Sequence, residues 1–239
     1  MNSKKIYLLN ASGLLLLIGL AACSATIADK TDGFQLKGKL ADSKGETVVL
    51  EQLAPDGLKR IDSTVLDGNG EFKINADIKE VGFYRLKITD HNFATFVFNP
   101  NEKVEITGNA VDLGNTYKVE GSEDSKYFWE MNKVSAANYR RRDSLQQTFQ
   151  HFLSGMKKDS SRMDSLSKAI EVPYNKLVEE QNNFLKSFIE KHTNSLASLA
   201  AAQQLQMDDF MDTYIKLDEG LLKQYPNSPY IKGFHQNVE

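Results

Sequence analysis

The sequence predicts an α+β protein in which an N-terminal antiparallel β-sandwich or barrel precedes an α-helical subdomain. Three observations lead to this prediction. Apolar and polar residues alternate from residue 34 to about residue 121, as expected for strands that bury one face. Turn-forming residues separate these short alternating runs. From residue 122 onward, apolar residues recur every three or four positions, which is typical of amphipathic helices.

The first 22 residues have the features of a bacterial export signal. Lys4 and Lys5 provide a positive start, and an apolar run of about nine residues begins at Leu14, too short to span a bilayer. The run ends in a tetrapeptide that resembles the lipobox of bacterial lipoprotein precursors, namely Leu20, Ala21, Ala22 and Cys23. The resemblance implies cleavage before Cys23 and a covalent lipid on its thiol. The alternatives are an ordinary signal peptide and an uncleaved anchor.

The residues after the lipobox bear on the location of the protein. In some diderm bacteria an Asp after the lipobox cysteine retains a lipoprotein at the inner membrane, whereas this chain has Ser24. The resemblance therefore implies a lipoprotein of the outer membrane that faces the periplasm. Residues 23–33 are short and polar, and we interpret them as a lipidated tether. Cleavage removes two lysines and changes the net charge from −3 to −5, which gives no electrostatic reason to expect nucleic acid.

Residues 34–121 are predicted to form the β domain. The runs that predict strands are residues 34–40, 47–50, 61–65, 72–74, 84–88, 93–98, 104–106 and 117–119. Most of them alternate, whereas residues 47–50 are a short β-branched run. Residues 93–98 are more continuously apolar than the others, which predicts a strand buried on both faces. Combinations of Gly, Asn, Asp and Pro predict turns at residues 42–45, 55–57, 67–70 and 99–101.

Residues 122–239 are predicted to form the helical subdomain. Ser122 can cap a first long helix, and residues 155–161 separate it from a second one. Pro173 lies within the second helix and is expected to kink or interrupt it. Ser195 and Asp208 are expected to cap two shorter helices, the second with Met211, Tyr214, Ile215 and Leu222 facing inward. Ser228 and Pro229 have the pattern of an N-cap followed by Pro at the first helical position.

The β half resembles a domain of unknown function, the 4369 family, found at the N-terminus of many bacterial lipoproteins. The resembling stretches are residues 34–40, 48–51, 61–65, 67–72, 82–86 and 104–108. In that family a helical segment follows, and often then a thioredoxin-like domain of thiol–disulfide interchange proteins. Residues 225–230 resemble the segment that precedes this domain, but the sequence has no Cys-x-x-Cys pair. The chain is thus expected to be a shortened family member or the front part of a longer protein, without the thiolate that such chemistry needs.

No group of residues in the sequence predicts catalysis or metal binding, so we expect no enzyme activity, no catalytic residues and no cofactor beyond the lipid on Cys23. The four histidines lack metal-ligand spacing, and no base is identifiable for Asp62, Ser63 and Thr64. We interpret residues 67–70 as a hairpin turn rather than a calcium loop. Residues 140–142 are three arginines that could touch lipid headgroups or an acidic partner, although a solvated helix face explains them better.

Aromatic residues are concentrated around the change from strands to helices: Phe93, Phe96, Phe98, Tyr127, Phe128 and Trp129. They could line a groove for a ligand or partner, or form the core and the seam between the two halves. We expect a membrane-anchored periplasmic module without catalytic activity, with a thioredoxin-like protein or domain as a possible partner. The alternatives are a periplasmic peptide- or glycan-binding lipoprotein and a hydrolase with an unrecognised site. The oligomeric state is not decided by the sequence.

Overall fold

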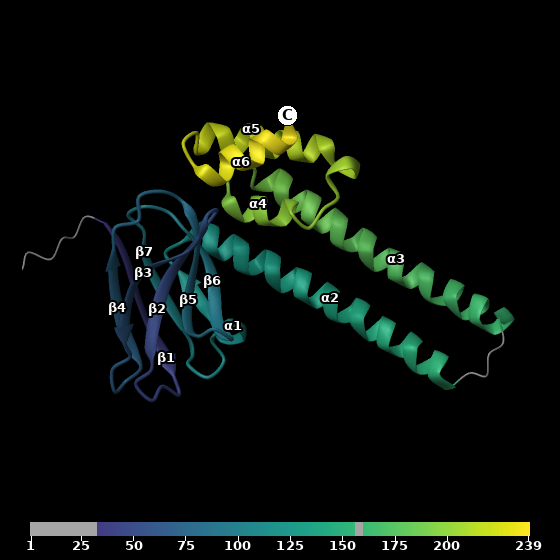
Figure 1. The fold of residues 1–239 in the computed structure, drawn as a ribbon, viewed down its shortest axis with the longest axis horizontal. Helices are drawn as coiled ribbons and strands as arrows, with labels where there is room; N and C mark the ends of the chain where they lie inside the picture. The colour runs from purple at the N-terminus through teal and green to yellow at the C-terminus, as the bar shows by residue number, and fades with distance from the viewer. Residues whose placement is uncertain (1–32, 156–159) are drawn as a thin grey trace, which may run out of the picture. The chain divides into compact units, whose positions relative to one another are not determined.

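A computed structural model describes residues 33–155 and 160–239, and residues 32–239 form one compact unit. The signal segment, the lipobox and Cys23 lie outside the described residues. The prediction of an α+β fold is confirmed, because the region up to Glu120 holds the strands and one short helix, and the other helices follow it (Figure 1). Within the described residues, no helix is both long enough and apolar enough to cross a bilayer.

The strands form a sandwich of two four-stranded sheets rather than a closed barrel. One sheet has the order β4-β1-β7-β8 and the other the order β3-β2-β5-β6. All neighbouring strands are antiparallel except β1 and β7, which run parallel. The strands are β1 (Phe34–Ala41), β2 (Thr47–Ala54), β3 (Gly57–Val65), β4 (Glu71–Ala76), β5 (Gly82–Thr89), β6 (Asn92–Phe98), β7 (Lys103–Asn109) and β8 (Lys118–Glu120).

The sandwich core consists of the side chains that alternate toward the inside of both sheets. Three phenylalanines form its aromatic centre: the ring centroids of Phe34 and Phe98 are 4.8 Å apart, and those of Phe96 and Phe98 are 5.2 Å apart. The prediction that residues 93–98 are buried on both faces holds only for the end of β6. There Phe96 and Phe98 face the sandwich core, whereas Val97 is buried in the second core, among the helices.

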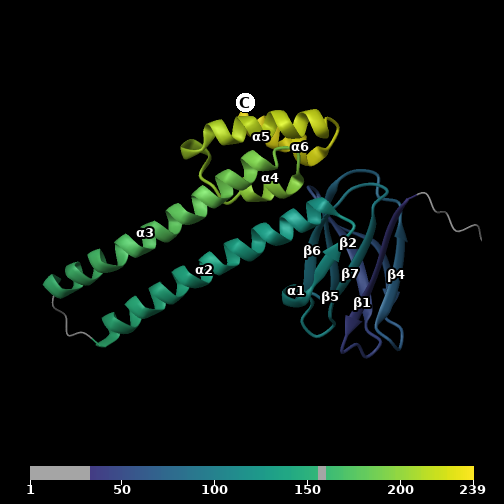
Figure 2. The ribbon, with the colours of Figure 1, turned by 180° about the vertical axis from the view of Figure 1, so that it is seen from behind.

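Helices make up the rest of the chain (Figures 1 and 2). They are α1 (Leu113–Thr116), α2 (Glu123–Gly155), α3 (Ser160–Lys191), α4 (Leu196–Ala202), the short 3₁₀ helix η1 (Met207–Asp209), α5 (Met211–Gln224) and α6 (Pro229–Val238). Two predicted caps are present. The Ser122 hydroxyl accepts a hydrogen bond from the backbone N–H of Ser125 at 3.4 Å, and the Ser195 hydroxyl accepts one from that of Ala197 at 3.1 Å. Pro229 occupies the start of α6, as predicted.

Two details of the helical half differ from the prediction. Pro173 does not interrupt α3, which runs continuously through it. Proline leaves the carbonyl four residues earlier without its helical donor, and Ala169 at that position is exposed, so water can satisfy it.

Asp208 does not cap α5. It lies in η1, and α5 begins three residues later, at Met211. The inward face of α5 therefore follows Tyr214, Leu217 and Leu221, whereas Ile215 is 43% exposed and Met211 is 37% exposed. The packing of this helix, rather than its local capping pattern, determines where it starts.

Candidate ligand-binding groove

An apolar groove lies where the sheet β3-β2-β5-β6 meets the helices. Its volume is about 650 Å³, within the range of roughly 300–1,000 Å³ that ligand pockets occupy. The sheet contributes Leu53, Phe83 and Thr95, and α2 contributes Phe128. The described residues that line it include no charged side chain, and the remaining ones are Pro55, Leu199, Ala200, Gln203, Met207, Tyr214, Pro229, Tyr230, Gly233, Phe234 and Asn237.

Three aromatic rings from distant parts of the chain define one wall of the groove. Phe83 packs at 5.9 Å from Phe128 and edge-on at 5.7 Å from Tyr230, measured between ring centroids. The Tyr230 hydroxyl donates a hydrogen bond to the carbonyl oxygen of Leu53 at 2.6 Å, which ties α6 to β2. Because this hydroxyl already has a partner, the wall presents mainly carbon to the groove.

Gly233 of α6 opens the groove. A β-carbon built at this position would meet no atom within 4 Å, so the groove extends to the helix backbone. Alanine favours a helix over glycine by about 1 kcal/mol. Side chains at this position therefore offer a way to fill the groove without disturbing the fold.

The aromatic residues proposed from the sequence are not brought together in this groove. For Phe96 and Phe98 the groove alternative is wrong and the core alternative is confirmed, because both are 0% exposed in the sandwich core and have no surface left for a ligand. Tyr127 packs against His192 in a tilted arrangement with 4.0 Å between ring centroids, outside the groove. Trp129 packs against the sandwich core and carries the Lys133 ammonium 4.8 Å above its ring.

Phe128 and Phe93 lie on the groove side of the sheet. Phe128, which the sequence analysis included, does line the groove. Phe93 is 37% exposed on the same sheet face, where the Arg85 guanidinium lies 5.1 Å from its ring centroid. Phe83, Tyr230 and Phe234 also line the groove and were not predicted from the sequence. The only signal for Phe83 is its place in an alternating strand, and nothing local links it to a helix at the other end of the chain.

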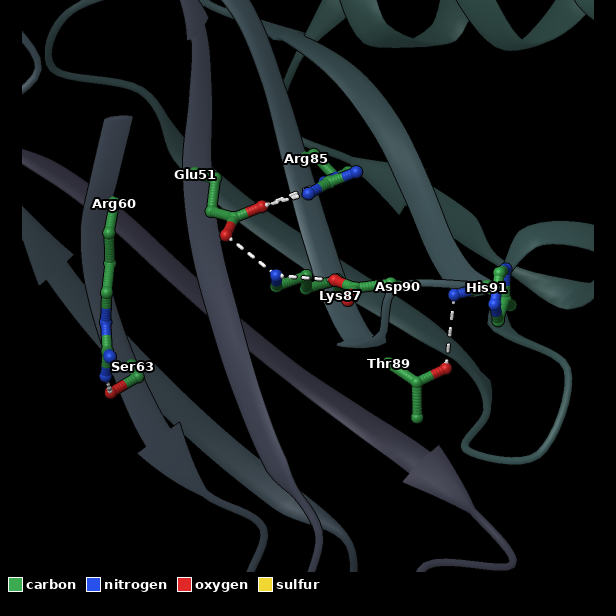
Figure 3. A network of polar contacts seen from close by, with 8 residues as sticks. All are labelled: Glu51, Arg60, Ser63, Arg85, Lys87, Thr89, Asp90 and His91. Atoms are coloured by element: carbon green, nitrogen blue, oxygen red, sulfur yellow. Dashed lines mark hydrogen bonds and ion pairs between the residues drawn. The ribbon is translucent and has the colours of Figure 1, made fainter. Parts of the chain in front are cut away.

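A network of charged residues continues the outer face of this sheet beside the groove (Figure 3). Glu51 of β2 accepts hydrogen bonds from Arg85 Nε at 2.9 Å and Arg85 Nη2 at 2.6 Å, and its other oxygen lies 2.9 Å from Lys87 Nζ. Lys87 also pairs with Asp90 at 2.9 Å. Burial alone would raise the pKa of Glu51, but the hydrogen bonds from Lys87 and Arg85 outweigh it and lower that pKa.

The register places this network next to the groove floor. Phe83 and Arg85 are two positions apart on β5, so their side chains share one face of the sheet. Thr95 of the groove is the direct partner of Arg85 in the ladder. The edge of this region holds two smaller contacts drawn in Figure 3: Arg60 donates to the Ser63 hydroxyl, and the backbone N–H of His91 donates to Thr89 Oγ1 at 3.4 Å.

A second polar cluster, which we call the Asp124 junction, joins four segments of the chain. It consists of Asn99, Glu102, Asp124, Ser195 and Tyr225. Asp124 accepts hydrogen bonds from Asn99 Nδ2 at 2.9 Å and from the Ser195 hydroxyl. The same Asn99 amide lies 3.3 Å from Glu102 Oε1. Burial, reinforced by the Asp124 charge, raises the pKa of Glu102, and burial likewise raises the pKa of Tyr225.

The Asp124 junction has the residue types of a hydrolase but not their geometry. Ser195 is the N-cap of α4, and its hydroxyl donates to Asp124 rather than to a histidine. The nearby His192 ring packs against Tyr127 and Phe188, and burial lowers its pKa. These contacts describe a structural tie between segments.

The other candidates from the sequence lie apart from the groove. Asp67 Oδ1 accepts hydrogen bonds from the N–H groups of Asn69 and Glu71, both at 2.8 Å, as expected for the predicted hairpin turn. Arg141 pairs with Glu180 at 2.9 Å, and the Arg142 guanidinium lies 4.4 Å from the ring centroid of Tyr139, so the arginines point in different directions. Among residues 33–155 and 160–239, no group of three or more His, Cys, Asp and Glu side chains could hold a metal ion.

Comparison with known families identifies the β half. Residues 34–128 match the family model of a domain of unknown function (DUF4369), which confirms the resemblance stated from the sequence. The match extends from β1 into the first turns of α2, and so includes Phe83, Thr95 and Phe128 of the groove. The groove lining from α4 to α6 lies outside it. No curated protein matches the chain.

Proposed function

We propose that this protein, with its DUF4369 domain, is a lipid-anchored periplasmic module that binds an apolar segment of a partner protein and has no catalytic role. The lipid anchor is proposed from the lipobox around Cys23 and the periplasmic side of the outer membrane from Ser24. A thioredoxin-like protein is the proposed partner, because such domains accompany the family that the β half resembles.

The observation that supports binding is the uncharged groove between the sheet and the helices. A volume of about 650 Å³ accommodates several side chains of an extended peptide. The wall formed by Phe83, Phe128 and Tyr230 offers apolar area, which is the main source of affinity in such sites. Gln203 and Asn237 at the rim supply amides that can hydrogen-bond to a peptide backbone.

A glycan is the second candidate, because aromatic rings also provide platforms for sugar rings. Sugars, however, present many hydroxyl groups that need hydrogen-bond partners when they are buried. The described lining has three side chains with amide or aliphatic hydroxyl groups, Thr95, Gln203 and Asn237, and no carboxylate. This composition favours an apolar peptide segment over a glycan.

Site-specific photocrosslinking in cells tests the binding role. Asn237 lines the groove, whereas its neighbour Gln236 is exposed and does not, so photoreactive phenylalanine analogues at these positions form a matched pair. We expect capture of a thioredoxin-like protein from position 237 only. Gly233→Trp should abolish the capture by filling the groove, and Gly233→Ala should retain it. Equal capture from both positions would contradict the groove as the binding site, and capture of glycan would support the alternative.

Metabolic labelling tests the anchor separately. A labelled fatty acid should be incorporated into the native chain and not into the Cys23→Ala variant, because the sequence contains only this cysteine. Membrane fractionation of the two forms should then place the native chain with the outer membrane and the variant in the soluble fraction. Incorporation of label into both forms would refute lipidation at Cys23.

A further inference from the structure

The outer face of the sheet β4-β1-β7-β8 is polar except for one alanine. The side chains that point away from the core on these four strands are exposed or half-buried, and they belong to Gln35, Lys37, Lys39, Ala41, Glu71, Lys73, Asn75, Lys103, Glu105, Thr107, Asn109, Lys118 and Glu120. Because Ala41 is the only apolar side chain among them and is small, no helix or second protein core is expected to pack on this face by hydrophobic contact.

This face is positive in a protein that is otherwise acidic. It has five lysines and three glutamates, so its net charge is +2. Residues 23–239 carry a net charge of −5, because the two lysines of the signal segment no longer contribute to the −3 of the whole sequence. Without the +2 of this face, the rest of residues 23–239 carries −7. The two signs are thus separated on the molecule, which orients it in the field of a charged surface.

The register concentrates cations in the middle of the face. Lys37 of β1 and Lys73 of β4 are direct partners in the antiparallel ladder, an arrangement of like charges that destabilises a sheet. Lys37 leans toward Glu105 at 3.0 Å, and Lys103 is the ladder partner of Gln35, the next outward residue of β1. Lys37, Lys73 and Lys103 border one shallow hollow of about 500 Å³, whose lining also includes the carboxylates of Glu105 and Glu120. With three lysines against two glutamates, the hollow remains positive, and the oxygens of a phosphate group there would meet more than one ammonium group.

The tether places this sheet near a membrane if Cys23 is acylated, as proposed above. Ten residues, 24–33, separate the lipidated cysteine from Phe34, the first residue of β1. Fully extended, ten residues span about 35 Å. The lysine face belongs to the sheet that contains β1, so it lies within reach of the lipid headgroups.

We propose that the outer face of β4-β1-β7-β8 is the membrane-facing surface of the protein and binds the phosphate groups of anionic lipids through Lys37, Lys73 and Lys103. Each lysine close to an anionic bilayer contributes about 1 kcal/mol, roughly a fivefold change in partitioning. The acidic remainder of the molecule is repelled from the same surface. This orientation keeps the groove, which lies beyond the opposite sheet, accessible from the periplasm.

Vesicle binding by the mature chain without acyl groups tests this surface independently of the anchor. Residues 23–239, with the Cys23 thiol blocked, are mixed with vesicles of phosphatidylcholine alone or of phosphatidylcholine and phosphatidylglycerol, and the bound fraction is measured by sedimentation. We expect binding to the anionic vesicles only. Raising the salt from about 0.1 M to about 1 M shortens the Debye length from about 10 Å to about 3 Å and should release the protein.

Two triple variants with the same change of charge decide whether the face is responsible. Lys37→Gln, Lys73→Gln and Lys103→Gln together should lower the partition coefficient at least about tenfold. The control variant replaces three exposed lysines of the helices, Lys126, Lys186 and Lys232, and should retain most of the binding. Circular dichroism checks that both variants are folded.

Three results would overturn the proposal: equal loss in the two triple variants, no preference for anionic vesicles, or complete competition by millimolar inorganic phosphate, which would instead indicate a site for the free anion. Failure of fatty-acid labelling at Cys23 together with vesicle binding as expected would refute the anchor and leave the surface in place.

Discussion

The Asp124 junction supports a quantitative prediction about how the strands and helices are held together. Asp124 belongs to the first turn of α2 and is 8% exposed. Its partners come from other segments: Asn99 follows β6, Ser195 precedes α4, and Tyr225 follows α5. Tyr225, at the end of α5, donates to Asn99 Oδ1 at 3.2 Å and lies 3.4 Å from Asp124 Oδ2. One carboxylate therefore orders groups from three segments that are distant in sequence.

These contacts determine how much stability the protein should lose when the Asp124 side chain is truncated. Hydrogen bonds to a charged group contribute about 1.5–3 kcal/mol each to stability. A buried donor left without a partner costs its full desolvation free energy. Asp124→Ala removes the acceptor of Asn99 Nδ2 and of the Ser195 hydroxyl at once. We subtract the cost of burying the carboxylate, which the variant avoids, and expect a loss of about 3–4 kcal/mol in the free energy of unfolding. For a chain of this size that loss lowers Tm by roughly 10 °C.

Thermal unfolding followed by circular dichroism, together with urea titration, measures this loss. Asp164→Ala on the exposed surface of α3 removes the same side chain without a buried partner and should change the free energy of unfolding by less than about 0.5 kcal/mol. Asp124→Asn and Ser195→Ala, alone and combined, should show a coupling of at least about 1 kcal/mol. A loss below about 1 kcal/mol for Asp124→Ala, or additive effects in the cycle, would refute the reasoning that this carboxylate joins the segments.

Three further predictions concern charge. Burial and the nearby Asp124 raise the pKa of Glu102, so its stabilising contribution is complete at low pH and is lost as the pH rises through that raised pKa. Glu102→Gln should therefore raise Tm at pH 7 by a few degrees, about 2–4 °C, and flatten the pH dependence of Tm above about pH 4.5; a lower Tm at pH 7 would contradict this. A hydrogen bond with Asp218 at 2.7 Å raises the pKa of His235, so Tm should fall as the pH rises from about 6.5 through the raised value. Melting curves of the His235→Gln variant should lack this fall in Tm. If the fall persisted in the variant, a group other than His235 would cause it. Glu51→Gln leaves Arg85 and Lys87 with a neutral partner in a largely buried network, and urea unfolding should show a loss of about 1–3 kcal/mol. Glu180→Gln, which breaks the exposed pair with Arg141, should cost less than about 1 kcal/mol, and equal losses would mean that burial of the Glu51 network has no energetic effect.

The sequence predicts the elements of this fold because their signals are local. Alternation marks most of the strands, a β-branched or continuously apolar run marks the others, and the hydroxyls of Ser122 and Ser195 cap helices as their positions indicate. The start of α5 could not be predicted in the same way, because Asp208 offers a plausible cap and only the packing of Tyr214 and Leu217 excludes it. Local propensity is a weak guide where tertiary contacts determine the outcome.

The groove was beyond sequence reasoning because its wall depends on long-range contacts. The hydrogen bond from Tyr230 to Leu53 joins residues 177 positions apart, and no periodicity in a single strand or helix reports such a pairing. The aromatic residues that are close in the chain do not share one site, and two of them, Phe96 and Phe98, belong to the sandwich core. Residues that are neighbours in the sequence point in different directions, because side chains alternate along β6 and rotate around α2.

The end of β6 explains why the strands and helices form one unit. Phe96 and Phe98 contribute to the sandwich core, and Val97 between them is buried in the helical core that contains Met131 and Leu185. Separation of the helices from this sheet would expose Val97. It would also remove one side of the groove that Phe83 lines on the neighbouring strand. The groove is therefore a property of the joined structure, and a fragment limited to residues 34–128 is expected to lack it even if its strands fold.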